Sequence, residues 1–176
     1  MPAMDRTAPA PAAAARSPPI DQRSFRAALG RFVTGVTVVT ALDGAGGPVG
    51  LTVNSFNSVS LDPPLILWSI DRRGSFFDAF AACERFAVNV LSVGQKDLAA
   101  RFAGAPNGRF DGVAAEPGLD GIPLLQNCIA WFECRTRQRF DGGDHLILVG
   151  LVERFAQSPG QELLYFAGSY GAATAL

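Results

Sequence analysis

Short runs of apolar and β-branched residues, separated by turn-forming stretches, constrain the fold of this chain more strongly than any other feature. Such runs are typical of strands, and continuous apolar runs suit strands that are buried on both faces. LDGAGG joins the first two runs and DGG joins the two longest ones, so both pairs are expected to form hairpins. The expected strands are VTVVTA (36–41), PVGLTVN (48–54), LILWSI (65–70), FAVNVL (86–91), two long strands near 128–140 and 145–156, and ELLYFAG (162–168).

Three short helices are expected among these strands. Asp21 is placed to cap the first helix, and Gly35 is expected to end it. The second helix is expected to begin at Ser75, and the third follows Ser92 and Gln95, which have the spacing of a capping box. One face of the first helix would carry the apolar residues Phe25, Ala28, Leu29, Phe32 and Val33.

The order of these elements indicates the fold class. A doubly wound parallel sheet requires strands that alternate regularly with helices, whereas most strands here are joined by hairpins. Residues 103–127 are rich in Gly and Pro, and we expect a long loop with little regular structure there. The sequence therefore predicts a mainly β fold, namely a Greek-key β-barrel with a few short helices.

Length and charge limit the possible functions. The 176 residues suit one domain over 21–176, preceded by a disordered tail over 1–20, where Ala and Pro predominate. A net charge of −1 gives no basic field to attract nucleic acid or anionic lipid, and no apolar run approaches the roughly 18 residues of a membrane span. Three cysteines with apolar neighbours predict buried, reduced thiols in a cytoplasmic protein.

Several catalytic motifs are excluded by their context. GAGGPVG (44–50) has the glycines of a dinucleotide-binding loop, but it lies between two strands with no helix after it. One histidine and three scattered cysteines predict no metal site. A chain this poor in acid–base groups suits a cofactor that brings its own chemistry.

Two polar segments are candidates for binding such a cofactor. TVNSFNSVSLDPP (52–64) is either a polar surface loop or a surface that hydrogen-bonds the edge of a heterocycle. DRRGSFF (71–77) places two arginines before Ser75 at an expected helix N-terminus, which is either an anion site or an ordinary capped helix with solvated arginines. Arg101 could reach the same anion or could simply be exposed.

From about Phe25 to Tyr170 the chain resembles the flavin reductase family, the small reductase components of two-component flavin-dependent monooxygenases. The resemblance rests on FRAALGRFVTGVTVVT, on NSFNSVSLDPPLIL, on RFAVNVL followed by QKDLAARFAG, and on GGDH. It implies an FMN-binding split barrel that forms a homodimer. It also implies hydride transfer from NADH or NADPH to FMN or FAD, with the reduced flavin passing to a separate monooxygenase.

The resemblance also implies a set of site residues. Some relatives have a hydroxyl or a thiol where this chain has Gly74, which leaves the partners of the flavin phosphate open. The implied flavin-binding residues are Thr52, Asn54, Ser55, Ser58, Val59, Ser60, Ser69, Ile70, Asp71, Arg73, Ser75, Phe76, Arg101 and Phe102. The implied nicotinamide contacts are Gly50, Leu51, Thr52, His145, Gly168 and Tyr170.

His145, the only histidine, illustrates how much the resemblance adds. On sequence alone, a histidine at a hairpin start is more often an exposed turn residue than a functional one. The resemblance makes it the residue that fixes the nicotinamide ring over the flavin, without transferring a proton in the hydride step. Two other functions stay open: a flavin-binding protein without reductase activity, as a sensor or store, and a barrel that holds a non-flavin apolar ligand.

Overall fold

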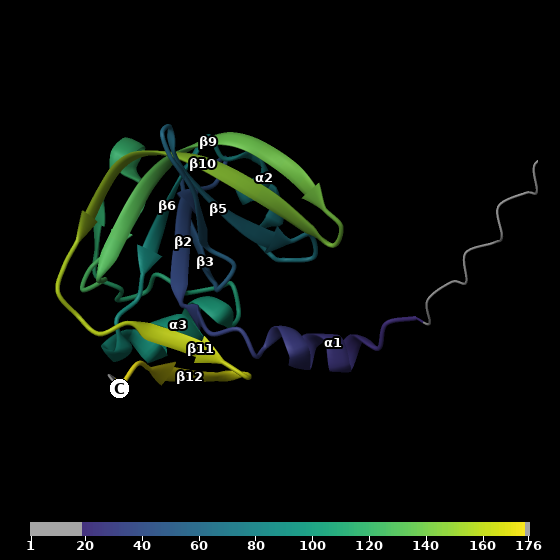
Figure 1. Ribbon diagram of the computed structural model, residues 1–176. Coiled ribbons are helices and arrows are strands. Elements are labelled where there is room, and N and C mark those ends of the chain that lie inside the picture. Colours follow the sequence, from purple (N-terminus) through teal and green to yellow (C-terminus); the bar gives the residue numbers. More distant parts are fainter. Residues whose placement is uncertain (1–18, 175–176) are drawn as a thin grey trace, which may run out of the picture.

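A computed structural model describes residues 19–174 of the chain, so most of the expected N-terminal tail lies outside the described residues. Its centre is a seven-stranded antiparallel sheet in the order β3-β2-β6-β9-β10-β5-β4, which curls into a barrel (Figure 1). The strands are β2 (Thr37–Leu42), β3 (Pro48–Val53), β4 (Asn57–Leu61), β5 (Pro64–Asp71), β6 (Arg85–Val90), β9 (Ala130–Gly142) and β10 (His145–Gln157). Since β2 lies beside β6 and β5 beside β10, the connections are not all hairpins, and the expected mainly β, Greek-key class is confirmed.

Smaller elements cover the ends of the barrel. Helix α1 (Gln22–Leu29) extends away from the barrel in Figure 1. Helix α3 (Lys96–Ala103) follows the 3-10 turn η1 (Val93–Gln95) and lies between the barrel and the hairpin of β11 and β12 (Figure 1). The remaining elements are β1 (Thr34–Gly35), α2 (Phe77–Ala82), β7 (Ala115–Pro117), η2 (Leu119–Gly121), β8 (Pro123–Leu125), β11 (Leu163–Phe166) and β12 (Ser169–Ala172).

Both helix caps that the sequence predicts near α1 and α3 are present. The Asp21 carboxylate accepts a hydrogen bond from the backbone N–H of Ser24 at 2.8 Å. Ser92 and Gln95 form a capping box, in which Gln95 Oε1 accepts from the Ser92 backbone N–H at 3.0 Å.

Four expectations about local structure are wrong. Helix α1 ends at Leu29 rather than near Gly35, because Thr34 and Gly35 pair with β11. The polar segment after residue 54 is not all loop, since β4 pairs there with β5. The segment 103–127, expected to have little regular structure, contains β7, η2 and β8. Strand β12, which the sequence pattern did not predict, follows the last expected strand.

The fourth correction concerns the second helix. Helix α2 begins at Phe77, and its N-cap, Phe76, makes no side-chain capping bond. Ser75 therefore lies in the turn before the helix and does not cap it. Because the helix has only six residues, its dipole offers little to an anion at that turn.

Aromatic side chains fill the barrel. Trp68 is fully buried, and its ring meets Phe80 at 5.2 Å and Phe86 at 5.7 Å in edge-on contacts. Cys83, Cys128 and Cys134 are buried and unpaired, and burial raises the pKa of the Cys134 thiol to about 12. Over residues 19–174, no helix has the length and apolar character needed to cross a membrane.

Candidate functional site

A cavity of about 190 Å³, which we call the inner cavity, lies where β3, the end of β5 and α3 meet. Six of its nine lining residues belong to the site that the sequence resemblance implies: Leu51, Thr52, Ile70, Ser75, Phe76 and Phe102. They come from four separate segments of the chain. The fold thus brings together residues that are up to about fifty positions apart in sequence.

Two further hollows lie beside the inner cavity. A cavity of about 240 Å³ shares Thr52 and Ala103 with it and adds Asn54 and Tyr170. A groove of about 980 Å³ shares Asn54 with that cavity, includes Gly168 and runs along α1. The shared lining residues place the three hollows next to one another, and apolar walls with a few polar groups are typical of cofactor sites.

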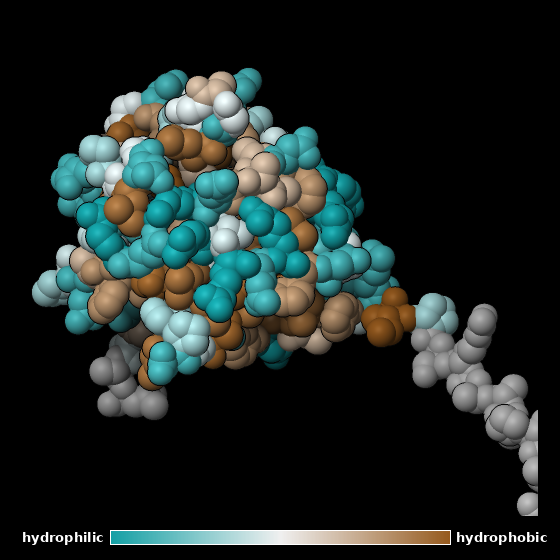
Figure 2. All heavy atoms as spheres, turned by 90° about the horizontal axis from the view of Figure 1, so that it is seen from above, coloured by the Kyte–Doolittle hydropathy of each residue, from teal (hydrophilic) through white to brown (hydrophobic). Residues whose placement is uncertain are grey.

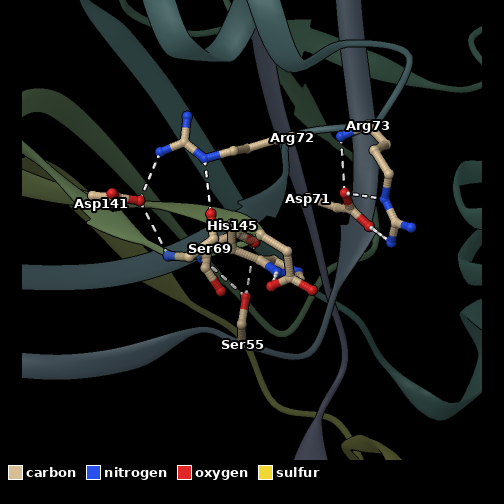
Figure 3. Close-up of polar contacts among 9 residues, drawn as sticks. Ser55, Ser69, Asp71, Arg72, Arg73, Asp141 and His145 are labelled. Atoms are coloured by element: carbon tan, nitrogen blue, oxygen red, sulfur yellow. Dashed lines mark hydrogen bonds and ion pairs between the residues drawn. The ribbon is translucent and has the colours of Figure 1, made fainter. Parts of the chain in front are cut away.

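The loop that precedes β4 is tied to β5 by one hydroxyl. Ser55 Oγ accepts from the Ser69 backbone N–H at 3.0 Å and donates to the Ser69 carbonyl at 3.2 Å (Figure 3). The pairing of β4 with β5 reaches only from Leu61–Pro64 to Asn57–Leu67. Ser55 lies two residues before β4, so its side chain continues that pairing past the first residue of the strand and holds Asn54 beside the hollow.

The two arginines before Ser75 are both paired with carboxylates (Figure 3). Arg73 forms hydrogen bonds with Asp71, which lower the pKa of the Asp71 carboxyl to about 2. Arg72 donates hydrogen bonds to the Asp141 carboxylate at 2.9 Å and to the Gly143 carbonyl at 3.0 Å. Neither arginine lines the inner cavity, so the expected anion site at this turn lacks the cations that the sequence suggested.

His145 begins β10, directly opposite Asp71 of β5. Its Nδ1 lies 2.7 Å from Asp144 Oδ1, and its side chain is 41% exposed. A carboxylate only accepts, so Nδ1 carries the proton in this contact, and in the tautomer that this contact selects Nε2 is an acceptor. His145 lies outside the three hollows, on the surface beside the end of β5.

Other implied residues are not gathered with the cavity. Ser58, Val59 and Ser60 lie on β4, the edge strand, opposite Leu65 and Ile66 at the far end of β5. Val59 falls at a register shift and is 48% exposed.

Two implied residues have structural partners. Arg101 donates to the Asp111 carbonyl at 2.8 Å and lines a different hollow, of about 290 Å³. Gly50 packs closely against two aromatic rings. A Cβ at this position would lie 2.7 Å from Phe102 Cε1 and 3.2 Å from Phe110 Cζ, so a larger residue would not fit. The glycine therefore permits close packing behind the cavity wall.

Arg109 is the charged lining residue that sequence reasoning missed. It is 8% exposed, lines the inner cavity and lies over the Phe76 ring at 5.0 Å from the centroid. It belongs to the segment 103–127, which the sequence indicates only as a loop. The one available signal was GRF (108–110), since Phe110 packs edge-on against Phe102 and carries Arg109 to the cavity.

Two alternative sites, a metal centre and a larger cavity, can be compared with this hollow. In the described part of the chain, no three His, Cys, Asp or Glu side chains are grouped so that they could hold a metal ion. A cavity of about 730 Å³ between β8 and β9 contains none of the implied residues, although it is larger than the inner cavity. The convergence of the implied residues, rather than volume, identifies the candidate site.

Comparisons with known proteins agree on one family. A model of the flavin reductase like domain matches residues 29–174. The FMN reductase (NADH) SmoA of Agrobacterium fabrum is 49% identical over 152 residues, which are 86% of each chain. The reductase component of a flavin-dependent trigonelline monooxygenase from Acinetobacter baylyi is 44% identical, and the chain spans only 48% of its length.

Solved structures give the same result. The NADH:FAD oxidoreductase SgcE6 of Streptomyces globisporus, in complex with NAD and FAD fragments, superposes with a TM-score of 0.83 at 36% identity. That match covers 88% of this chain and 93% of SgcE6. The flavin reductase PheA2 superposes with a TM-score of 0.81 at 36% identity and is covered completely. On this fold, this site and these relatives, the chain belongs to the flavin reductase like family.

Proposed function

We propose that the protein is a flavin reductase that oxidises NADH or NADPH, reduces FMN or FAD and supplies the reduced flavin to a separate monooxygenase. The observation that carries the proposal is the convergence of six implied flavin and nicotinamide residues on the inner cavity. Relatives named as an NADH-dependent FMN reductase and an NADH:FAD oxidoreductase support the same activity. Relatives named as monooxygenase reductase components support the partner.

The residues around the hollow suit a flavin. Leu51, Ile70 and Phe76 supply apolar wall, while Thr52 and Ser75 supply hydroxyls. The Thr52 hydroxyl already donates to the Ala99 carbonyl at 2.7 Å, so its oxygen can serve a ligand only as an acceptor. The inner cavity is smaller than the roughly 300–1,000 Å³ typical of a whole ligand site, so it suits one end of the flavin, with the remainder in the adjoining hollows.

A bound flavin supplies the hydride acceptor, and the chain needs to supply no general base. The protein has to hold two flat rings in contact and exclude water between them. Asn54 offers a neutral amide for the flavin edge, and the two hydrogen bonds between the Ser55 hydroxyl and the Ser69 backbone keep this segment in place. Such preorganised dipoles stabilise the charge that develops on the flavin.

We propose that His145 binds the nicotinamide nucleotide and orients it. Its Nε2 is free to accept a hydrogen bond from an amide or a hydroxyl, while Asp144 fixes the tautomer. His145 then acts in binding and alignment and transfers no proton in the hydride step. Gly168 and Tyr170, on the turn and strand of the β11–β12 hairpin, line the adjoining hollows and complete the nicotinamide side.

We also propose a homodimer, because one face of the described chain exposes apolar side chains. On α1 and just after it, Phe25 is 53% exposed, Leu29 59% and Phe32 78%, although the sequence spaces them as one packing face. Figure 2 shows hydrophobic residues, in brown and tan, along the lower right edge of the view. Apolar surface of this kind is normally covered by a partner. Sedimentation velocity at micromolar concentration should give a dimer, and an active monomer would refute the proposal.

The activity is tested by following NADH or NADPH oxidation at 340 nm with and without added FMN or FAD. A reductase gives turnover that depends on the flavin, and the four pairings identify the preferred substrates. Flavin binding without turnover would favour the sensor or storage alternative, and failure to bind flavin would favour a different ligand. We further propose a cytoplasmic location, which the three buried thiols support.

A further inference from the structure

Arg109 is the one buried arginine among residues 19–174, and no carboxylate in that range lies within salt-bridge distance of it. Instead, its guanidinium donates to three backbone carbonyls. Nε donates to the Ala105 carbonyl at 3.0 Å, Nη1 donates to the Gly50 carbonyl at 2.6 Å, and Nη2 donates to the Gly104 carbonyl. These bonds fix the plane of the group from three sides.

Two of the five N–H groups of Arg109 have no acceptor among the described residues. The side chain lines the inner cavity, and none of the other lining residues carries a charge. Burial lowers the pKa of the Arg109 guanidinium, yet arginine stays protonated at neutral pH. The inner cavity therefore contains a fixed positive charge that only carbonyl dipoles offset. A bound anion would neutralise this charge and accept the two remaining hydrogen bonds.

The surroundings indicate which anion. Gly74 and Ser75 line the inner cavity, and its volume of about 190 Å³ is too small for a whole flavin, so one end of the ligand has to occupy it. Arg72 and Arg73, the other cations near this turn, are paired with Asp141 and Asp71. Arg109 is thus the only cation that lines the cavity, and guanidinium groups match phosphate oxygens with two parallel hydrogen bonds.

We propose that Arg109 binds the phosphate of the flavin through these two free N–H groups, and that it makes the protein select phosphorylated flavins over riboflavin. This inference rests on the proposed function, because it assigns one end of the flavin to the inner cavity. It also moves the phosphate partner from the arginines before Ser75 to a residue of the loop after α3. The isoalloxazine end then extends toward Thr52 and Asn54.

The test is equilibrium binding of FMN and riboflavin, followed by flavin fluorescence. In the unmodified protein FMN should bind more tightly than riboflavin. Arg109→Met should raise the FMN Kd by about 10–100-fold and the riboflavin Kd by less than about 3-fold. Arg109→Lys, which keeps the charge and loses the fork, should give an intermediate FMN Kd. Arg137→Met, at an exposed position on β9, is the matched control and should change neither Kd.

A second measurement remains available if Arg109→Met fails to fold. Inorganic phosphate added to the unmodified protein should compete with FMN and leave riboflavin binding unchanged. Equal losses of FMN and riboflavin affinity in Arg109→Met, or phosphate that competes with neither or with both equally, would overturn the assignment. If the unmodified protein reduces FMN while any of these holds, only the role of Arg109 fails; if it binds neither flavin, the proposed function fails too.

Discussion

Replacing Ser55 with alanine should loosen the flavin-binding loop without disturbing the barrel. The Ser55 hydroxyl accepts from the Ser69 N–H at 3.0 Å and donates to the Ser69 carbonyl at 3.2 Å. Each such bond contributes about 0.5–1.5 kcal/mol, and the Ser69 backbone groups would lose their only partner on that side. We therefore expect the free energy of unfolding to fall by about 1–3 kcal/mol. Flavin affinity should fall by about 3–10-fold, because binding must then order the loop.

Urea unfolding and flavin titration measure these two effects. The urea m-value should stay constant, since the surface exposed on unfolding is unchanged. Ser158→Ala is the control, because Ser158 is exposed and its hydroxyl makes no hydrogen bond among the described residues. A loss below about 0.5 kcal/mol in Ser55→Ala, with unchanged flavin affinity, would refute the view that this hydroxyl anchors the loop.

Three further predictions concern the nicotinamide contact, the packing and the thiols. His145→Ala should lower kcat/KM for the nicotinamide substrate by about 10–100-fold and leave the flavin Kd unchanged, which steady-state kinetics and titration would check. Gly150→Ala would place a Cβ 2.5 Å from Phe86 and should cost about 1–3 kcal/mol in urea unfolding, whereas Gly94→Ala meets no atom within 4 Å and should be neutral. Burial raises the pKa of Cys128 to about 11 and of Cys134 to about 12, above the ordinary 9.0 of the unfolded chain. The unfolded state then loses these protons first as pH rises, so stability should fall from about pH 9 upward, with urea unfolding at pH 7 to 10.5 as the check.

Sequence periodicity predicted the barrel strands because the chemistry that forms them is local. The β-branched run that became β2 is buried on both faces, and the apolar run that became β5 has one buried and one half-buried face; their composition reflects this burial. The segment that contains β4 was read as a loop, because an edge strand pairs on one side only and can keep polar side chains exposed.

The candidate site was predicted where its residues belong to recognisable segments. Phe102 lies in a motif that carries the family resemblance, Thr52 and Ser75 lie in the two polar segments that the sequence singles out, and all three meet at the inner cavity. Arg109 could not be predicted in the same way, since its importance depends on burial and on three carbonyls from Gly50, Gly104 and Ala105. Conversely, Arg73 looked free in the sequence and is paired with Asp71, two residues away, through the fold of the turn.

Anaerobic stopped-flow mixing of the flavin-loaded protein with NADH tests the central claim most directly, because it observes hydride transfer in one turnover. If the protein is a flavin reductase, the absorbance of oxidised flavin near 450 nm should disappear in a single phase far faster than that of free flavin with NADH. Repeating the reaction with NADPH identifies the preferred donor. Flavin that binds with normal affinity but bleaches no faster than free flavin, with either donor, would contradict the proposal that this site aligns a nicotinamide with a flavin.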